Sequence, residues 1–273
     1  MPPSGRTTPL DDIAYLVRSE HRSPTLVALT VRPRSRSELW ELTQVSESTI
    51  RRTLREFEER KWIRRTGYQY EATELGASVA EAMVDLIERI ETEQQVRDVW
   101  DTLPGRSDDF SIDLCSGATV TVADSDRPYR PVERFRTLLA ETETFRAIHF
   151  EVAILEPCKE ALCGRVLDGM NADIVAPPRL AEYIRDNCPE LISESLESGN
   201  LTLRLHDDLP HYGLCLFDDR IAIRGYDTDA GTLRVLLDTD SPDAREWAES
   251  IFRRYRRETP TISLETGSNS PTK

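Results

Sequence analysis

Lysine is nearly absent from this sequence. Of its 35 basic residues only Lys61, Lys159 and Lys273 are lysines, which leaves 35 − 3 = 32 arginines. Long apolar segments are lacking too: no run of about 18 apolar residues occurs, which excludes a membrane-spanning helix. The opening stretch MPPSGRTTPLDD contains no apolar signal-peptide core. We therefore expect a cytoplasmic protein without membrane contact.

Acidic residues are abundant where lysine is scarce. The chain carries 49 acidic residues against 35 basic ones, a net charge of −14. This combination resembles the proteins of extreme halophiles, and we expect a halophilic source. An acidic surface that serves only solubility is the alternative.

Cysteine is sparse and follows no metal-binding spacing. The five cysteines stand at positions 115, 158, 163, 188 and 215, without a Cys-x-x-Cys pair. An odd number of cysteines in a cytoplasmic chain of this size favours buried thiols over a disulfide framework. Cys158 and Cys163, near the start of a predicted helix, leave a redox pair as the alternative.

The length and the charge distribution indicate two domains. The chain of 273 residues exceeds the usual single-domain size of roughly 100–150 residues. Residues 1–70 hold 13 basic and 9 acidic residues, a net charge of +4, whereas residues 71–273 hold 22 and 40, a net charge of −18. We expect a disordered tail over residues 1–9, a basic domain over 10–72, a linker helix over 73–103, an acidic domain over 105–260 and a disordered tail over 261–273.

Three short helices are predicted in the N-terminal domain. Apolar residues recur at helical spacing in Leu10–Arg18 and in Ser23–Val31. In Ser35–Thr43 the residues Ser35 and Glu38 have the spacing of a capping box, which marks the start of a helix.

A fourth helix follows Ser46, which we predict to be its N-cap. Its apolar residues Ile50, Leu54 and Phe57 share one face. The opposite face and its flanks are polar and mostly basic. Exposed arginines and hydroxyls in the first half of a helix are suited to bind guanine and phosphate in the major groove of DNA.

A hairpin is predicted directly after this helix. Trp62–Arg65 and Tyr68–Tyr70 have strand character, with Thr66-Gly67 as the two-residue turn. Such helices followed by a hairpin are typical of a winged helix-turn-helix domain, in which the hairpin is the wing. The predicted contacts to double-stranded DNA are Ser46, Ser48, Thr49, Arg51, Arg52, Arg55, Arg64, Arg65, Tyr68 and Gln69. For each arginine alone, a solvated surface charge is the alternative.

A long helix is predicted from Thr73, its N-cap, towards the Leu103-Pro104-Gly105 break. Val79, Met83, Leu86 and Ile90 form an apolar stripe along it, which is a candidate coiled-coil seam. We therefore predict a homodimer. A linker helix that packs on its own domain is the alternative.

Strands and helices alternate in the second domain. This order predicts an α/β fold with a mostly parallel sheet that ends in an antiparallel meander. The predicted strands are Ala118–Ala123, Ala147–Leu155, Ala172–Val175, Asn200–Leu205, Gly213–Phe217, Arg220–Arg224 and Thr232–Leu237. The predicted helices are Pro131–Glu141, Cys158–Leu167, Pro178–Asp186, Glu190–Ser198 and Pro242–Arg257.

Two segments resemble known families. Leu29–Ala80 is similar to the N-terminal winged helix of haloarchaeal transcriptional regulators. DSPDAREWAESIFRRYRRET, residues 240–259, is similar to the end of the middle domain of the methanogenesis regulatory protein family, with Trp247, Phe252, Tyr255 and Arg256 at the matching positions. For the whole chain the resemblance implies a mixed α+β and α/β protein whose C-terminal effector domain is phospholipase-D-like and non-catalytic.

Phospholipase-D-like hydrolysis depends on His-x-Lys motifs. None of the four histidines, His21, His149, His206 and His211, is followed by lysine two positions later. We therefore expect no enzymatic activity and no cofactor.

An effector site is predicted on adjacent strands of the second domain. It consists of His211, Tyr212, Asp218 and Arg224, which would contact a small anionic molecule. Ordinary surface and turn residues are the alternative, with Asp218-Asp219 as the turn. His206, His211 and Cys215 are a poor metal set, since a proline-containing loop separates the histidines, and we predict no metal.

These patterns predict a sequence-specific DNA-binding transcriptional regulator whose second domain senses an effector or binds another protein. One alternative is an interaction adaptor that uses its winged helix without DNA. Another is a redox- or metal-responsive form of the regulator.

Overall fold

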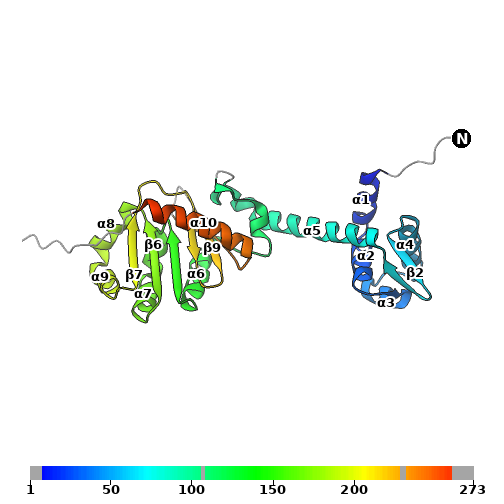
Figure 1. Cartoon of the computed structure of the whole chain (residues 1–273), viewed down its shortest axis with the longest axis horizontal. Coiled ribbons are helices and arrows are strands. Elements are labelled where there is room, and N and C mark those ends of the chain that lie inside the picture. The colour runs from blue at the N-terminus through cyan, green and yellow to red at the C-terminus, as the bar shows by residue number, and fades with distance from the viewer. Residues whose placement is uncertain (1–7, 106–107, 228–231, 260–273) are drawn as a thin grey trace, which may run out of the picture. The chain divides into compact units, whose positions relative to one another are not determined.

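The structure is a computed structural model that describes residues 8–105, 108–227 and 232–259 (Figure 1). Its contacts divide the chain into an N-terminal unit, Met1–Ile90, and a C-terminal unit, Glu91–Lys273. The predicted tail 261–273 and most of the tail 1–9 lie outside the described residues. Thr8 and Pro9 do not belong to a tail, because Thr8 caps the first helix and Pro9 is its first residue.

The N-terminal unit contains all the helices and the hairpin that the sequence predicted. Its elements are α1 (Pro9–Val17), α2 (Arg22–Val31), β1 (Arg34–Ser35), α3 (Arg36–Thr43), α4 (Glu47–Glu59), β2 (Ile63–Thr66), β3 (Gln69–Ala72) and the first part of α5 (Glu74–Val96). The two-residue strand β1 was not predicted. It pairs with β3 and extends the hairpin to a three-stranded sheet in the order β1-β3-β2.

The predicted start of α3 is confirmed. The Ser35 hydroxyl accepts from the backbone N–H of Glu38, and the Glu38 carboxylate accepts in return from the Ser35 N–H at 2.8 Å. This reciprocal capping box satisfies two backbone donors that a helix start otherwise leaves unpaired.

The hairpin turn lies one residue later than predicted. Thr66 pairs with Gln69, so Gly67 and Tyr68 form the two-residue turn and Thr66 ends β2. Gly67 has a φ of +63°, a conformation that glycine adopts without steric cost. Thr66 is β-branched and is suited to the extended strand instead.

A small apolar core holds the N-terminal unit together. Ile50, Leu54 and Phe57 of α4 are at most 1% exposed, and the Phe57 ring packs against Tyr15 and Trp62. Gly76 brings the first turn of α5 directly onto the chain that enters β2. A Cβ atom at Gly76 would lie 1.8 Å from the Trp62 carbonyl oxygen, so only glycine fits there.

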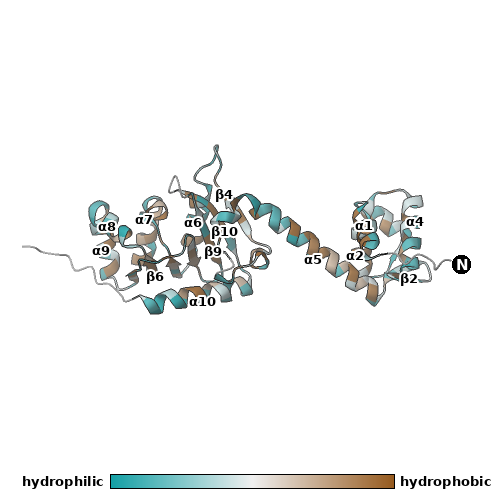
Figure 2. Ribbon diagram, turned by 90° about the horizontal axis from the view of Figure 1, so that it is seen from above, coloured by the Kyte–Doolittle hydropathy of each residue, from teal (hydrophilic) through white to brown (hydrophobic). Residues whose placement is uncertain are grey.

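Helix α5 begins as predicted, since the Gly76 N–H donates to the Thr73 hydroxyl at 3.1 Å. It ends at Val96 and continues as a 3-10 helix, Arg97–Thr102. The predicted stripe is not uniform along α5. Met83 belongs to the N-terminal core, with Val79 packed against it, whereas Leu86 and Ile90 are 43% and 47% exposed. Figure 2 shows hydrophobic residues along this helix.

The C-terminal unit is built on a seven-stranded sheet. Its strands are β4 (Thr119–Val122), β5 (Thr144–Ile148), β6 (Asn171–Ala176), β7 (Leu201–Leu205), β8 (Gly213–Leu216), β9 (Ile221–Tyr226) and β10 (Leu233–Thr239). Their order in the sheet is β4-β10-β9-β8-β5-β6-β7. The helices are η3 (Ile112–Cys115), α6 (Arg130–Ala140), α7 (Val152–Leu167), α8 (Pro178–Asn187), α9 (Pro189–Glu197) and α10 (Pro242–Glu258).

The predicted antiparallel meander is confirmed for β8, β9 and β10, whereas the prediction that the sheet is mostly parallel is wrong. Among the strands that the structure describes, only β5-β6 and β6-β7 pair in parallel, because after β7 the chain returns to place β8 antiparallel on the other side of β5. The predicted strand Ala147–Leu155 is also wrong in its second half, since β5 ends at Ile148 and α7 begins at Val152. The start of α7 was missed because Pro157, usually a helix breaker, stands inside that helix.

Helices cover both faces of the sheet. Phe135 of α6 and Leu162 of α7 pack on one face with Ala147, while Trp247 and Phe252 of α10 pack on the other. One polar contact joins α6 to the sheet: buried Asp238 of β10 accepts from Arg134 at 2.7 and 2.9 Å and from Arg220 at 3.0 Å.

Candidate nucleic-acid interface

Helix α4 has one buried face and one exposed basic face. Ile50, Leu54 and Phe57 point into the core, and the side chains opposite them are open to solvent. Exposed on α4 and its N-cap are Ser46, Ser48, Arg51, Arg52 and Arg55, while Thr49 is half-buried. This is the distribution that the sequence predicted for these six residues.

The hydroxyl groups at the start of α4 form a connected cluster. The Ser46 Oγ accepts from the Thr49 N–H at 3.3 Å, which confirms the predicted N-cap. It also lies 2.9 Å from both the Ser48 and the Thr49 hydroxyl oxygens. The first turn of α4 therefore presents hydroxyls beside backbone N–H groups, a combination suited to an anion such as a phosphate.

The three arginines of α4 differ in their surroundings. Arg55 lies 3.6 Å from Glu59, an exposed pair that contributes little stability. Arg51 and Arg52 make no hydrogen bond or ion pair with any described residue. Burial, and then the charges of Arg22 and Arg52, lower the pKa of His21. The imidazole of His21 lies 3.0 Å from the Thr53 hydroxyl, so it links α2 to the buried side of α4.

The four predicted wing residues are all exposed. Arg64 donates to Glu71 at 2.7 Å, and Arg65 donates to the Gly67 carbonyl at 2.9 Å. Tyr68, at the tip of the hairpin, is 89% exposed. A tyrosine in that position is available for a partner, because the hairpin buries almost none of its ring.

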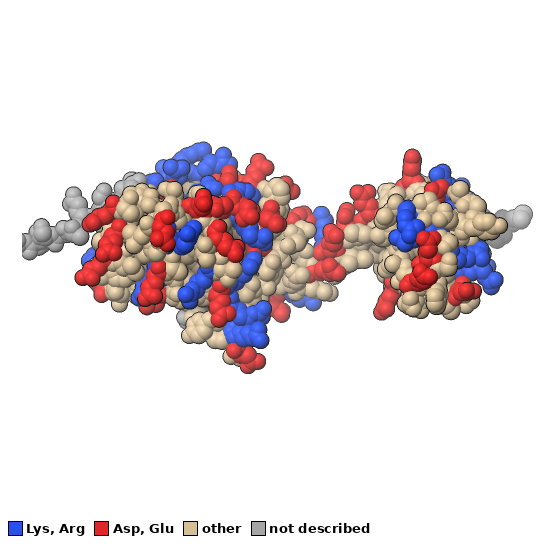
Figure 3. Space-filling view, turned by 90° about the horizontal axis from the view of Figure 1, so that it is seen from below, with Lys and Arg blue, Asp and Glu red and all other residues tan. Residues whose placement is uncertain are grey.

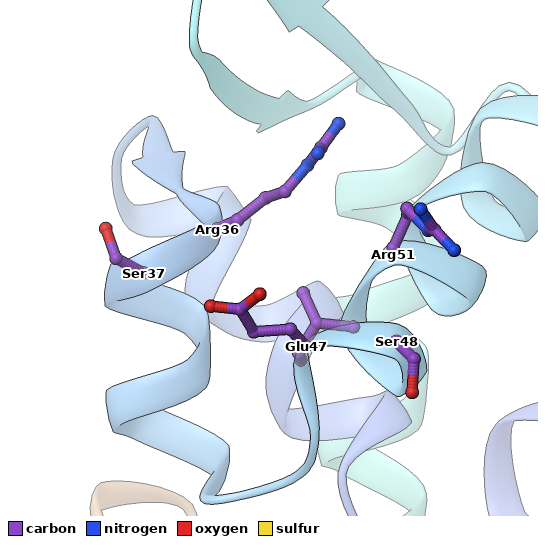
Figure 4. A pocket seen from close by; sticks show the side chains of 6 residues that line it. Arg36, Ser37, Glu47, Ser48 and Arg51 are labelled. Carbon is purple, nitrogen blue, oxygen red and sulfur yellow. The ribbon is translucent and has the colours of Figure 1, made fainter.

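A cavity of about 490 Å³ lies between the starts of α3 and α4. Arg36 and Arg51 stand on opposite sides of it, with the Glu47 carboxylate directed from α4 towards α3 (Figure 4). Arg36 and Ser37, which also lines the cavity, were missed as site residues. The signal that could have found them is the capping box itself, because it places both at the N-terminus of a second helix.

Two acidic side chains lie close to this basic face: Glu47 lines the cavity with Arg51, and Glu59 lies 3.6 Å from Arg55. In the view of Figure 3, acidic side chains lie on both units and along α5. The acids of α4 other than Glu47 are Glu56, Glu58 and Glu59, in its second half. The first half of α4 thus keeps its positive character.

The predicted effector residues do not form one site. Asp218 accepts from the N–H groups of Glu143 and Thr144 at 2.7 and 2.8 Å and so fixes the start of β5. It therefore lies at the opposite end of the strands from Arg224, which is paired with Gly213 at the start of β8. His211 contacts the Leu103 carbonyl through Nε2 at 3.0 Å.

Tyr212 and Arg224 have no exposed surface. Arg224 donates to the Ile148 carbonyl at 3.1 Å and packs over the Phe150 ring at 5.1 Å. The side chains of Tyr212 and Arg224 are therefore part of the protein interior. The prediction that they belong to an exposed effector site is wrong, and so is the alternative that they are ordinary surface residues.

The cysteines are free and buried, as predicted. Burial raises the pKa of the Cys158 thiol to about 12, which disfavours the thiolate that redox chemistry needs. Within the described ranges, no three His, Cys, Asp or Glu side chains are grouped so that they could hold a metal ion. No helix in that part of the chain has the length and apolar character to cross a membrane.

Two family models match the sequence. Residues 128–258 match the middle domain of the methanogenesis regulatory protein FilR1, and residues 10–95 match the HVO_A0261 N-terminal domain. No curated protein matches. The FilR1 match includes α10, where Trp247 donates to the Asp108 carbonyl at 2.7 Å and Arg256 lies 3.3 Å from Asp173.

The similarity to solved structures is weak. TrmBL2, an archaeal chromatin protein, is 14% identical over 92% of this chain and 99% of its own, with a TM-score of 0.42. An IclR-family regulator from Rhodococcus is 15% identical over 93% and 96%, with a TM-score of 0.20. Phosphatidylserine synthase from Haemophilus influenzae is 15% identical over 53% and 39%, with a TM-score of 0.41. TM-scores this low do not establish a shared fold. The general class of the protein, a regulator, is indicated by the match of residues 128–258 to a regulatory-protein domain.

Proposed function

We propose that the protein is a transcriptional regulator whose N-terminal unit is a winged helix-turn-helix domain that binds double-stranded DNA. In this proposal α4 enters the major groove and the β2-β3 hairpin contacts the backbone or the minor groove. The acidic, lysine-poor composition favours a halophile as the source, and the resemblance to haloarchaeal regulators favours an archaeon. A protein that binds its DNA would act in the cytoplasm.

One observation carries the proposal: α4 presents Arg51, Arg52 and Arg55 to solvent opposite a fully buried apolar face. An amphipathic helix normally needs only a solvated outer face. The outer face of α5 carries mainly acids, whereas α10 also exposes Arg253, Arg254, Arg256 and Arg257. The outer face of α4 is basic in a protein of net charge −14. It therefore suits a polyanion better than an apolar protein surface, which disfavours the adaptor alternative.

The decisive experiment is binding to DNA selected from a random duplex library with the full chain. The double variant Arg52→Ala/Arg55→Ala should lose affinity for the selected sequence by about 100-fold, since each arginine–base contact is worth roughly 1–3 kcal/mol. Both side chains are exposed, so the melting temperature should not change. Undiminished binding would refute α4 as the reading helix.

A matched control separates local contacts from net charge. Arg136→Ala/Arg185→Ala removes two exposed arginines from the C-terminal unit. We expect this variant to bind the selected DNA like the wild type. An equal loss in both variants would mean that overall charge, rather than the α4 face, determines binding.

The protein is further proposed to act as a homodimer through α5. Leu86, Ile87 and Ile90 are 41–47% exposed on consecutive turns, and a contiguous exposed apolar patch is typical of an interaction surface. A second copy of α5 would cover them and provide two α4 helices for half-sites about 34–36 Å apart.

The dimer is tested by light scattering coupled to gel filtration. Leu86→Asn/Ile90→Asn should reduce the measured mass to that of the 31.1 kDa chain. Leu10→Ser/Val17→Ser, on the exposed apolar face of α1, should not. A monomeric wild type would contradict the proposal, and dissociation by only the second variant would move the interface to α1.

The C-terminal unit is proposed to be a phospholipase-D-like regulatory domain without hydrolytic activity. His149 follows β5, but the residue two positions later is Glu151, which approaches the imidazole and also pairs with Arg179. A carboxylate at the position of the motif lysine does not supply the positive charge that phosphoryl transfer needs. Turnover of a phosphodiester such as bis-p-nitrophenyl phosphate, lost in His149→Ala, would overturn this assignment.

A further inference from the structure

The C-terminal unit contains a cavity of about 700 Å³ where β9 ends and β10 begins. Its apolar walls come from Tyr129 and Val132 at the start of α6, Val152 and Ala153 at the start of α7, and Leu233 of β10. Small-molecule sites usually have volumes of roughly 300–1,000 Å³. This edge is also the carboxyl end of β5, the side on which α/β sheets bind ligands.

The polar groups of the cavity are mainly acceptors. Glu156 and Asp227 contribute carboxylates. Glu156 already accepts from Lys159 at 2.9 Å and from the Tyr183 hydroxyl, but a carboxylate has about four acceptor positions. The cation on the wall, Arg234, is directed elsewhere, since it donates to the Asp98 carbonyl at 2.8 Å.

A further acceptor follows from the proline inside α7. Pro157 has no N–H, so the Ala153 carbonyl four residues earlier lacks the donor that an α-helix normally provides. Both residues line the cavity. This backbone oxygen and the two carboxylates favour a ligand that donates hydrogen bonds, and they disfavour an anion.

We propose that this cavity binds an apolar organic cation, that is, a hydrocarbon or aromatic body that bears an amine or quaternary ammonium group. The body packs against Val132, Val152 and Leu233, and the charge faces Asp227 and Glu156. The ring of Tyr129, 69% exposed, provides an aromatic face for the cation. Binding of the cation requires no DNA. A role of this binding in regulation rests on the proposed function.

The test uses two dyes that fluoresce in apolar surroundings: berberine, a cation, and 1-anilinonaphthalene-8-sulfonate, an anion. Titration of the full chain at about 1 M KCl screens the general attraction of an acidic protein for a cation. We expect saturable binding of one berberine per chain and at least about tenfold weaker binding of the anion. Equal affinity for the two dyes would overturn the assignment of ligand charge.

Variants locate the binding. Ala153→Phe fills the cavity and should weaken berberine binding by at least about tenfold. Ala123→Phe, at another lining position, should do the same if the first variant does not fold. Glu156→Gln should weaken it about threefold to tenfold, whereas Glu160→Gln, the same change at an exposed position of α7 outside the cavity, should not.

Berberine binding that survives both filling variants, with their melting transitions intact, would place the dye elsewhere and contradict the proposal. Because the assay contains no DNA, its failure leaves the DNA-binding proposal standing. Equally, loss of DNA binding in the α4 variants has no effect on this measurement.

Discussion

The guanidinium of Arg36 donates to the Tyr70 hydroxyl from Nε at 3.2 Å and from Nη2 at 2.9 Å. This contact joins the start of α3 to β3, although 34 residues separate the two in the sequence. Because Arg36 also lines the cavity beside α4, the hairpin helps to place a charge in the proposed DNA interface. The wing therefore contributes to the interface through its buried side as well as its exposed tip.

Removal of this acceptor should destabilise the N-terminal unit. In Tyr70→Phe, a residue only 3% exposed, the loss of a hydrogen bond from a charged donor should lower the free energy of unfolding by about 1–2 kcal/mol. Urea denaturation followed by circular dichroism measures it. Tyr68→Phe removes a tyrosine hydroxyl from the exposed tip instead and should leave the free energy of unfolding unchanged. An equal loss of stability in both variants would contradict the role of the Arg36 contact.

Two glycine-to-alanine substitutions should have opposite effects. In Gly76→Ala the new methyl group would collide with the Trp62 backbone, and we expect a loss of at least about 3 kcal/mol. In Gly164→Ala, inside α7, no atom lies within 4 Å of the new Cβ, and stability should rise by about 0.5–1 kcal/mol. Thermal unfolding compares them, and a stable Gly76→Ala protein would show that α5 can shift away from Trp62.

The arginines of α4 should separate into a phosphate contact and a base contact. Arg51 faces the cavity shared with Arg36, so Arg51→Ala should weaken binding equally on all DNA and reduce the slope of log affinity against log salt by about 1. Arg52 lies on the outward face, so Arg52→Ala should relax the preference at one base pair by about 1–3 kcal/mol. Fluorescence anisotropy on selected and scrambled duplexes at several salt concentrations distinguishes them, and exchanged phenotypes would reverse the assignment.

The capping box of α3 should give acid-sensitive stability. Hydrogen bonds from the Ser35 backbone, then from Arg32 and the Ser35 hydroxyl, lower the pKa of Glu38 from 4.5 to about 2. A lowered pKa means that the stabilisation is complete above pH 4.5 and is lost as the pH falls towards 2. The difference in urea midpoint between wild type and Glu38→Gln should shrink over that interval, and a constant difference would contradict it.

Thiol reagents should not reach the native protein. Burial raises the pKa of Cys115 and Cys158 to about 12 and of Cys215 to about 11. Ellman's reagent at about pH 8 should therefore react slowly with the folded chain and with all five cysteines after denaturation. Rapid labelling of one cysteine in the native protein would revive the redox-responsive alternative.

Local chemistry made the N-terminal unit predictable. The capping residues Ser35, Ser46 and Thr73 mark helix starts through hydrogen bonds within three residues, and the apolar spacing in α4 determines its outward face. The strand β1 could not be predicted from pattern, because a two-residue strand exists only through its pairing with Tyr70 and Gln69.

The C-terminal unit was less predictable because its order depends on long-range pairing. Nothing local in Gly213–Leu216 shows that this strand pairs with β5 rather than extending the sheet beyond β7. Arg224 was taken for a ligand contact because arginine is usually exposed, whereas here aromatic rings and two backbone carbonyls surround it. The 700 Å³ cavity was missed since its walls come from segments about a hundred residues apart.

Gly76 also has a mechanical consequence. With no side chain between it and the Trp62 carbonyl, the first turn of α5 and the base of the hairpin are in direct backbone contact and should rotate as one rigid piece. A partner that twists α5 about its axis would then swing the tip at Tyr68 by the same angle. A twist applied at the apolar stripe would therefore reach the wing through this backbone contact, and α4 would feel it as well, since the Trp62 N–H donates to the Phe57 carbonyl at 3.0 Å.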